Sequence, residues 1–442
     1  MKIALFWHRR DLRQHDNAGL AAALQSGLPV APLFIYDSDI LDYVPRPHDA
    51  RLTFIYDHVE QLAVQTEQTG GVFLAHYGKP VSIFRQLLAK YEIGAVFTNE
   101  DYEPYATQRD TEVAQLLAEH TIPFTAVKDQ VIFAKNEVLA KSGKPHKSFG
   151  PYRDAWLAAL LPDMLHPFPS SELFTQEHLA QLPDVPARPT LEDMGFERFE
   201  QQVPVAELPP ESLVRTYHET RNFPGMVNSS TRRSVHLRFG TLSVRELMRQ
   251  AQKLNPKLLA ELVWRDYFMT LLWHYPFTAH ESFEPRLREV PYRNNEEEFQ
   301  RWCDGQTGYP LVDAGMRELN ETGFIHNRAR IAVAGFLTKH LLIDWRLGER
   351  YFADKLLDYD LALNVGNWQW VAGTGVVAAP WFRVYSPENQ LQSYDPNLEY
   401  VRRWVPEYGT NAYVAPVVDH KFARTRAIDT FRAAYRAAAQ PS

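Results

Sequence analysis

The first 130 residues alternate between short apolar runs and longer amphipathic segments. The apolar runs have the composition of buried strands and are KIALFW (2–7), PVAPLFIYD (29–37), GGVFLAHYG (70–78), IGAVFTNED (93–101) and PFTAVKDQVIFA (123–134). The segments between them have helical length and are NAGLAAALQS (17–26), RLTFIYDHVEQLAVQT (51–66), PVSIFRQLLAKY (80–91) and YATQRDTEVAQLLAEH (105–120). Strands that alternate with helices predict βαβ units. We therefore expect residues 1–130 to form an α/β domain with a doubly wound, parallel five-stranded sheet, which binds ligands at the carboxyl ends of its strands.

The regular pattern is lost over residues 131–204. Nine prolines fall between Leu161 and Pro210, and periodic apolar positions are few there. Proline disfavours both helix interiors and central strands. We expect this stretch to be a long interdomain linker that wraps around the molecule and contains short helices.

From residue 205 onward the apolar positions recur with helical spacing, and no stretch resembles a strand. The predicted helices are LSVRELMRQAQKL (242–254), PKLLAELVWRDYFMTLLWHYP (256–276), LVDAGMRELNETG (311–323), IHNRARIAVAGFLTKHLL (325–342) and LGERYFADKLLDYDLA (347–362). This pattern predicts an all-helical domain over residues 205–436. The stretch NVGNWQWVAGTG (364–375) places two tryptophans among glycines and asparagines, which is typical of a bare loop that approaches a ligand closely, although a tight helix start packed against a core would also explain it.

Composition narrows the function classes. The single cysteine, Cys303, excludes an internal disulfide, a zinc site built on several cysteines and a four-cysteine iron–sulfur cluster, and we expect no metal. The net charge is −7, so binding to nucleic acid would require a local basic patch. There is no apolar run long enough to cross a membrane, and the N-terminus becomes charged too soon for a signal peptide, so we expect a cytoplasmic protein.

Three stretches combine residues that suit chemistry, and each also has a simpler structural interpretation. SSTRRSVHLRFGTLS (229–243) offers hydroxyls and arginines near a helix start, which suits a diphosphate but also suits a capped helix with a solvated basic face. In AELVWRDYF, Glu261 and Trp264 share a helix face, yet Glu261 and Arg265 are also spaced as an ordinary surface ion pair. Arg330 of HNRARI is expected to pair with Asp358 or Asp360.

Together, six motifs resemble the photolyase/cryptochrome family, most closely its class I cyclobutane pyrimidine dimer photolyases. They are HRRDLRQHDNAGL (8–20), STRRSVHLRFGTLS (230–243), ELVWRDYF (261–268), the stretch from TGYPLVDAG to GERYF (307–352), LLDYDLALNVGNWQWVAGTG (356–375) and APWFRVYSPENQ (379–390). Each motif is weak by itself, but six in the same order are specific. The resemblance implies light-dependent DNA repair, in which reduced FAD (FADH⁻) in the helical domain absorbs blue light and donates an electron to a flipped-out cyclobutane dimer, which splits into monomers.

The resemblance also implies roles for individual residues around FAD. The diphosphate and ribityl chain are assigned to Tyr217, Ser230, Thr231, Arg232, Arg233 and Ser234. The residues assigned to the isoalloxazine ring are Arg330, Asp358, Tyr359, Asp360 and Asn364, with Asn364 facing flavin N5. Plant cryptochromes carry Asp at the position of Asn364 and the insect type carries Cys, so this asparagine favours repair over signalling.

A second group of residues matches the lesion pocket and the DNA contacts of the family. Glu261 matches the acid that hydrogen-bonds the dimer, and Trp264 and Trp370 match the two indoles that clasp it. The remaining members of this group are Asn327, Arg221, Arg328, Arg383 and Gln390. The (6-4) photolyases carry His at the position of Asn327, which argues against (6-4) repair. The alternatives are a (6-4) photolyase and a cryptochrome-like flavin photoreceptor.

Electron transfer to oxidised FAD is assigned by the resemblance to a chain of aromatic residues. Trp368 and Trp345 match its inner members, whereas Tyr292 stands where most relatives have a third tryptophan. Ile331, Arg233 and Val377 also depart from the family pattern. The resemblance further implies an antenna chromophore of folate or deazaflavin type in or beside the N-terminal domain, where Tyr102 and Glu103 resemble part of a folate site, UV-damaged DNA as partner, and a monomeric protein.

Overall fold

The computed structural model describes residues 2–199, 201 and 203–437 and divides the chain into two compact units. The first unit comprises the described residues of Met1–Glu137, Ala158–Leu208 and Arg233–Lys253. The second comprises those of Val138–Leu157, Pro209–Arg232 and Leu254–Ser442. The chain therefore passes between the units several times. The division differs from the predicted one in that residues 138–157 belong to the second unit and residues 233–253 to the first.

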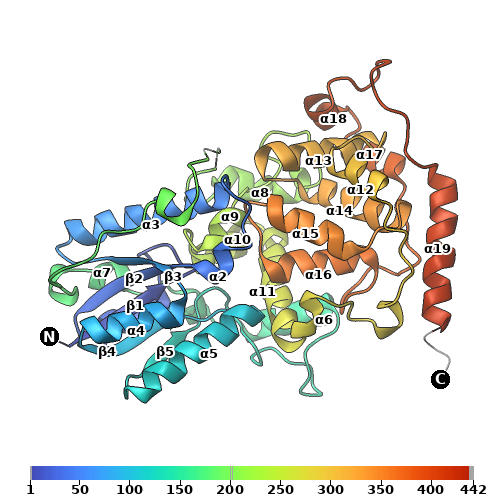
Figure 1. Ribbon diagram of the computed structural model, residues 1–442. Coiled ribbons are helices and arrows are strands. Elements are labelled where there is room, and N and C mark those ends of the chain that lie inside the picture. The colour runs from blue at the N-terminus through green and yellow to red at the C-terminus, as the bar shows by residue number, and fades with distance from the viewer. Residues whose placement is uncertain (1, 200, 202, 438–442) are drawn as a thin grey trace. The chain divides into compact units, whose positions relative to one another are not determined.

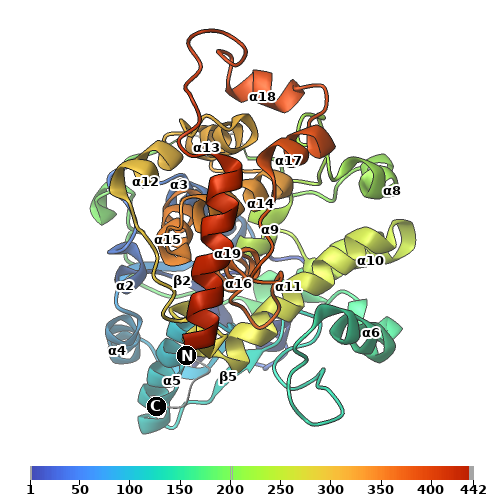
Figure 2. The same cartoon turned by 90° about the vertical axis from the view of Figure 1, so that its right-hand side faces the viewer.

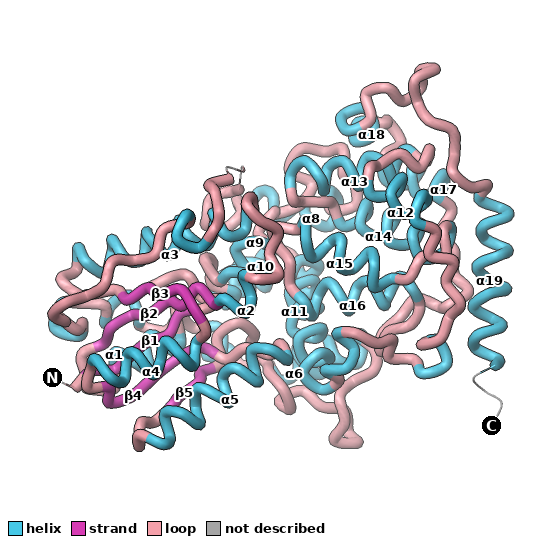
Figure 3. The backbone as a smooth tube through the Cα atoms, in the orientation of Figure 1, coloured by secondary structure: helices cyan, strands magenta, loops and turns pink. Residues whose placement is uncertain are grey.

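The first unit is built on a parallel sheet with strand order β3-β2-β1-β4-β5, coloured magenta in Figure 3. The strands are β1 (Ile3–His8), β2 (Val30–Asp37), β3 (Leu74–Gly78), β4 (Ile93–Asn99) and β5 (Phe124–Val127). In register, Ala4 pairs with Val30 on one side of β1 and with Ala95 on the other. This order confirms the predicted doubly wound, five-stranded α/β fold.

The first unit also contains helices and 3₁₀ turns. They are α1 (Ala18–Leu24), α2 (Ser38–Leu41), α3 (Ala50–Gln68), α4 (Pro80–Lys90), α5 (Pro104–Glu119), η1 (Pro162–Leu165), α7 (Ser170–Leu173), η2 (Gln176–His178), η3 (Glu192–Met194), α9 (Ser234–Phe239) and α10 (Val244–Leu254), the last of which ends at the unit boundary. Figure 1 shows α4 and α5 in front of the strands.

Alternate residues of β1 enter two separate apolar layers. Ile3, Leu5 and Trp7 pack with the apolar side chains of α4 and α5. Ala4 and Phe6 pack with those of α1 instead. Successive side chains of a strand point to opposite faces, so this division places helices on both faces of the sheet, as predicted.

The described part of the second unit contains helices and no strand. Its elements are α6 (Phe149–Ala159, which ends just beyond the unit boundary), α8 (Glu211–Thr220), α11 (Pro256–His274), η4 (Pro276–Ala279), η5 (Pro285–Leu287), α12 (Glu296–Cys303), α13 (Pro310–Thr322), α14 (Asn327–Gly335), the π-helical turn η6 (Phe336–His340), α15 (Trp345–Lys355), α16 (Leu361–Ala372), α17 (Pro387–Tyr394), α18 (Glu399–Trp404) and α19 (His420–Ala437). In Figure 2, α19 faces the viewer, and it packs on η5 and η6. No described helix of either unit combines the length and apolar character needed to cross a membrane.

Two predictions about this unit were wrong in detail. The segment 347–362 is not one helix, because α15 ends at Lys355 and α16 begins only at Leu361. The stretch Asn364–Gly375 is not a bare loop, because α16 continues through Ala372. Its glycine has a packing role: a Cβ on Gly366 would lie 2.2 Å from the Phe268 ring, so α11 and α16 approach too closely for a larger residue.

Candidate functional site

An ion pair joins α14 to the turn before α16. The Arg330 Nη2 atom donates to both carboxylate oxygens of Asp358, at 3.1 and 2.9 Å, and its Nε atom donates to the Ile325 carbonyl at 2.9 Å. The Asp358 side chain is 5% exposed and the Arg330 side chain 31%, so the carboxylate is shielded from water while the guanidinium is partly open to it. This geometry matches the Arg330–Asp358 pair predicted from the sequence, while Asp360 instead caps α16 by accepting from the Leu363 amide at 3.2 Å.

Asn364 is buried on α16 and is oriented by a residue that the sequence did not single out. Its amide Nδ2 donates to the Glu349 carbonyl at 3.1 Å and to the Glu349 carboxylate at 3.0 Å. The Tyr359 hydroxyl donates to the same carboxylate at 3.3 Å. Burial raises the pKa of Glu349, against the opposing effect of these two donors. Glu349 thus fixes which way the Asn364 amide points, and only the fold reveals it, because it lies on another helix.

The predicted diphosphate segment falls across the boundary between the units. In the second unit, Ser230 and Thr231 are partly exposed, and Arg232 has a left-handed backbone (φ 49°) with its guanidinium 4.6 Å from the centre of the Phe324 ring. In the first unit, Arg233 donates from Nε to the Glu207 carbonyl at 2.6 Å, and Ser234 begins α9.

The chemistry of these side chains fits FAD. Hydroxyl and guanidinium groups suit a diphosphate, while the Arg330–Asp358 pair and the Asn364 amide suit the polar edge of an isoalloxazine ring. Tyr217 lies on α8, and burial raises its pKa to about 12, so it is a neutral hydrogen-bonding group at ordinary pH.

The predicted lesion-binding acid is held by an arginine that was predicted to bind DNA. Arg221 donates from Nη1 to the Glu261 carboxylate, and Lys257 approaches the same oxygen at 3.5 Å from one turn earlier on α11. The Arg221 side chain is only 10% exposed. Next along the chain, Asn222 accepts from the Arg328 guanidinium at 2.9 and 2.7 Å. The short Arg221–Asn222 turn therefore fixes two members of the predicted site, a role that sequence reasoning missed.

The two indoles assigned to the lesion differ in environment. Phe149 covers one face of Trp264, with ring centres 3.7 Å apart and nearly parallel, and Phe268 lies 5.3 Å away. Trp370 is half-buried against the main core of the unit. Any ligand that stacks on Trp264 can therefore use only the part of the indole that Phe149 and Phe268 leave uncovered. Phe149 was read only as part of a linker, so this contact was not predicted.

The other predicted DNA contacts lie on three elements. Asn327 is exposed at the start of α14, Arg383 is exposed in the segment that follows α16, and Gln390 is buried on α17. Val377 departs from the family pattern, and it lines a small cavity together with side chains of α11 and α16. This departure therefore places an apolar side chain in the wall of that cavity.

The predicted electron chain is split between two apolar clusters. Trp368 and Trp345 belong to the main core, where the Trp368 ring lies 5.1 Å from Phe352 and 6.3 Å from Trp302. Tyr292 instead packs on a smaller cluster and contacts Phe431 at 6.1 Å. The hydroxyl of Tyr292 is buried without a hydrogen-bond partner among the described residues, and burial raises its pKa. A tyrosine loses its proton when it is oxidised, and no described residue accepts a hydrogen bond from the Tyr292 hydroxyl, which disfavours Tyr292 as the terminal electron donor.

We expect Tyr292→Phe to change the rate of flavin photoreduction by less than about twofold, because a phenol with no acceptor contributes little. Tyr292→Trp should accelerate photoreduction, because an indole can be oxidised before it loses a proton. Flavin absorbance followed under blue light with an external thiol measures both rates. Trp345→Phe is the control that should slow photoreduction, and a large loss in Tyr292→Phe would contradict the prediction.

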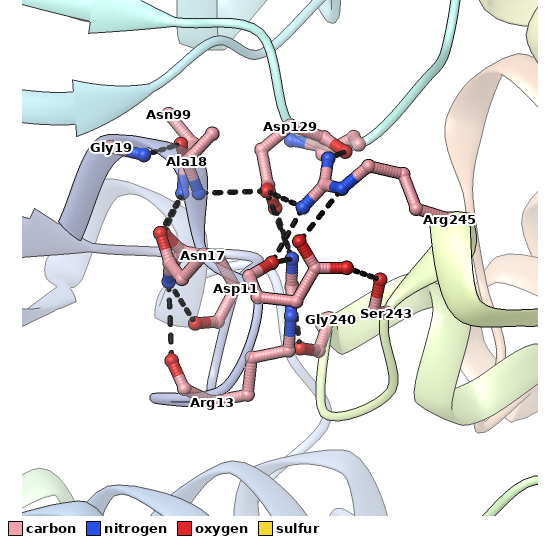
Figure 4. Close-up of polar contacts among 12 residues, drawn as sticks. Asp11, Arg13, Asn17, Ala18, Gly19, Asn99, Asp129, Gly240, Ser243 and Arg245 are labelled. Carbon is pink, nitrogen blue, oxygen red and sulfur yellow. Dashed lines mark hydrogen bonds and ion pairs between the residues drawn. The ribbon is translucent and has the colours of Figure 1, made fainter. Parts of the chain in front are cut away.

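The sheet's carboxyl edge, where a ligand of the first unit would be expected, is occupied by the protein's own polar groups (Figure 4). Asn99 at the end of β4 donates to Asp11 and Asn17, at 2.5 and 2.8 Å, and accepts from the Gly19 amide at 2.8 Å. Arg13 and Arg245 both pair with Asp129 just beyond β5. The polar side chains at these strand ends therefore bind one another.

The residues predicted to resemble a folate site are also paired within the first unit. The Tyr102 hydroxyl donates to Glu100 at 3.2 Å. The Glu103 carboxylate accepts from Arg10 at 2.8 Å and lies 3.2 Å from Arg238. An antenna at this edge would have to form its contacts beside these pairs.

Comparison with known proteins agrees with this arrangement. Residues 4–172 match the family described as DNA photolyase, and residues 258–411 match the FAD binding domain of DNA photolyase. The deoxyribodipyrimidine photo-lyase of Synechococcus sp. is 34% identical, over 94% of this chain and 93% of its own. The second unit thus carries the FAD-binding domain of that family.

Two solved structures are similar over almost their whole length. The photolyase of Sulfolobus tokodaii, crystallised with two FAD molecules that imply a novel light-harvesting cofactor, is 30% identical with a TM-score of 0.82 and covers 99% of this chain and 100% of its own. The cryptochrome of Synechocystis sp. is 26% identical with a TM-score of 0.83, covering 98% and 99%. With a family match in both units and a relative above 30% identity along nearly the entire sequence, the chain belongs to the photolyase/cryptochrome family.

Proposed function

We propose that this protein is a deoxyribodipyrimidine photo-lyase that uses blue light to split cyclobutane pyrimidine dimers in DNA. The observation that carries the proposal is that Arg221 pairs with Glu261, which lies one turn before Trp264 on α11. A carboxylate, a guanidinium and an indole are thus available to one ligand. FAD, when bound and reduced, supplies the electron that light sends to the dimer. Thymine carbonyls accept hydrogen bonds, so a group aimed at them must donate, and the Arg221 guanidinium, oriented by the Glu261 carboxylate, does so.

The surrounding residues bind and orient in this proposal. Arg328, fixed by Asn222, and the exposed Arg383 neutralise phosphates on either side of a flipped nucleotide. Asn364, oriented by Glu349, would contact the isoalloxazine ring of bound FAD. These arginines supply a local positive surface on a chain of net charge −7, so lesion affinity should fall with salt.

The test uses FAD-loaded protein reduced with dithionite and an oligonucleotide with a single thymine dimer. Blue light should restore the thymine absorbance at catalytic protein concentration, and the dark reaction should not. A (6-4) photoproduct in the same sequence should stay intact, because Asn327 stands where (6-4) enzymes carry histidine. A protein that leaves the dimer intact in light would sink the proposal.

The second candidate is a cryptochrome-like photoreceptor, which the similarity to the Synechocystis cryptochrome supports. That function predicts bound FAD and light-driven colour changes without repair of any lesion. The dimer experiment separates the two.

We expect Trp370→Ala to weaken binding of dimer-containing DNA by about 1–3 kcal/mol, the range found for loss of one base-stacking aromatic ring. Trp370 is half-buried on α16 and Trp368 is fully buried two positions earlier, so the two should fail differently. Trp368→Phe should slow photoreduction and leave lesion affinity unchanged. Fluorescence anisotropy of a labelled oligonucleotide measures the affinity, and a Trp370→Ala protein with wild-type affinity would remove this residue from the pocket.

A further inference from the structure

Lys339 is a fully enclosed amine in the π-helical turn η6. Lys339 is only 2% exposed. Its Nζ atom donates to the Ala372 carbonyl at 2.8 Å and to the Trp381 carbonyl at 3.0 Å. The Phe431 ring of α19 closes the remaining side, with its centre 3.3 Å from Nζ. Within the described chain, no carboxylate forms an ion pair with this amine, and burial lowers the pKa of Lys339 well below its usual value. A buried amine held only by main-chain oxygens is costly, so its position calls for a reason.

The two carbonyls bound by Lys339 are the two ends of one doubled-back segment. Ala372 is the last residue of α16, and the chain then returns so that the Ala379 amide donates to the Trp370 carbonyl at 3.0 Å. Gly373 makes the reversal possible, with φ at +78° and the Trp381 Cα atom 2.7 Å from where its Cβ would lie. Lys339 therefore ties the exit of α16 to the end of the return path.

This segment connects residues that our proposed function assigns to DNA. Trp370 precedes it on α16, and Arg383 follows it and is exposed, beside the 55% exposed Phe382. A lysine suits the task because an ammonium or amine at the tip of a long chain can donate to two acceptors at once. Methionine has nearly the same length and no donor, so it would leave both carbonyls without a partner.

We propose that Lys339 is a positioning residue that holds the segment between Ala372 and Arg383 in the conformation that binds the lesion strand. The proposal rests on the proposed function for the identity of the DNA, while the tie itself stands on the two hydrogen bonds. Lys339 would touch neither DNA nor flavin, and it would act through the backbone of this segment.

The experiment compares FAD-loaded wild type with Lys339→Met and Lys339→Gln. Amide hydrogen exchange without DNA should be faster in residues 373–383 of Lys339→Met, with exchange elsewhere in the unit unchanged. The dissociation constant for a thymine-dimer oligonucleotide should rise about tenfold, the scale expected when buried acceptors lose their donor. Glutamine keeps two N–H donors on a shorter chain, so it should rescue both quantities partly. Lys355→Met, at the exposed end of α15, is the matched control and should behave as wild type.

If Lys339 only positions the binding segment, Lys339→Met should leave two quantities unchanged: the flavin absorption spectrum and the number of dimers split per photon at saturating DNA. If Lys339 instead supports the whole unit, both quantities should fall. Wild-type exchange in residues 373–383 would overturn the proposal, and so would faster exchange without any loss of lesion affinity. If Lys339→Met does not fold, Lys339→Gln carries the same comparison. Failure of the wild type to bind or repair the dimer would count against the proposed function. The hydrogen-exchange result would then test by itself whether Lys339 holds residues 373–383 in place.

Discussion

Asp129→Ala should lower the free energy of unfolding of the first unit by about 3–5 kcal/mol, the cost of removing one partner from a buried ion pair. Arg13 and Arg245 donate to the Asp129 carboxylate at distances between 2.7 and 2.9 Å, and the Ala18 amide adds a bond at 3.1 Å. The three side chains are between 1 and 7% exposed. Without Asp129, the Arg245 guanidinium would keep the Asp16 carboxylate as a partner. The Arg13 guanidinium would keep the main-chain carbonyls of His15, Asp16 and Gly240, and its buried charge would lose the Asp129 carboxylate.

Native-state hydrogen exchange of the β1 amides measures this change, because β1 lies at the centre of the sheet and should open only when the unit unfolds. Asp57→Ala is the matched control, since Asp57 pairs with Arg198 where both side chains are 47% exposed. An exposed pair contributes less than about 1 kcal/mol. Equal effects of the two substitutions would contradict the buried-charge argument.

The same carboxyl gives the first unit a pH dependence with a defined sign. Burial alone would raise the pKa of Asp129, but the charges and hydrogen bonds of Arg13 and Arg245 lower it to about 2. The folded pKa lies below the value of about 4 for an unfolded chain, so this stabilisation is complete above pH 4 and is lost as the pH falls towards 2. Exchange of the β1 amides between pH 5 and 2.5 should show that loss in wild type and a flatter profile in Asp129→Ala.

The sheet could be predicted because its signal is local. Each strand is a continuous apolar run, and each helix between strands has a regular period, so neither depends on knowing the rest of the fold. Residues 233–253 were harder, because α9 and α10 look like any other helices of the C-terminal half. Their assignment to the first unit depends on long-range contacts, such as those of Arg245 and Ser243 with Asp16, more than 200 residues away.

The stretch around the two tryptophans was misread for a similar reason. Glycine and asparagine disfavour helices in isolation, which predicted a loop. In the fold, Gly366 lies within α16, where its lack of a side chain lets the helix approach Phe268 of α11. The packing of α16 on α11 outweighs the weak local preference of glycine and asparagine against a helix.

The residues of the candidate site also fall into those that the sequence could predict and those that it could not. Arg330 and Asp358 were predictable as partners because an arginine and an aspartate that lie in apolar segments need each other. Glu349, Phe149 and Lys339 were not, because their partners lie on other elements and no motif within their own helices marks them. Residue types predict which groups can act, and the fold decides which groups orient them.

Glu261→Ala should reduce the number of dimers split per absorbed photon at least about tenfold, since removing one group that stabilises developing charge commonly costs more than that. Arg221 is 10% exposed and pairs with this carboxylate, so the substitution leaves the guanidinium without the group that orients it. The amide of Glu261→Gln can still accept a hydrogen bond from Arg221, so this variant should keep an intermediate yield. Lys257→Ala is the control, because it removes the other, 52% exposed, cation near Glu261 and should leave the yield unchanged.

The measurement is the repair yield of chemically reduced protein on a thymine-dimer oligonucleotide under monochromatic blue light, at saturating DNA. Saturation separates the electron-transfer step from lesion affinity, and a flavin spectrum identical to wild type separates it from cofactor loss. A Glu261→Ala protein with full yield would show that Arg221 alone serves the dimer. A Glu261→Gln protein as poor as Glu261→Ala would instead mean that the charge of the carboxylate is needed, because a glutamine amide can accept a hydrogen bond from Arg221 but cannot form an ion pair with it.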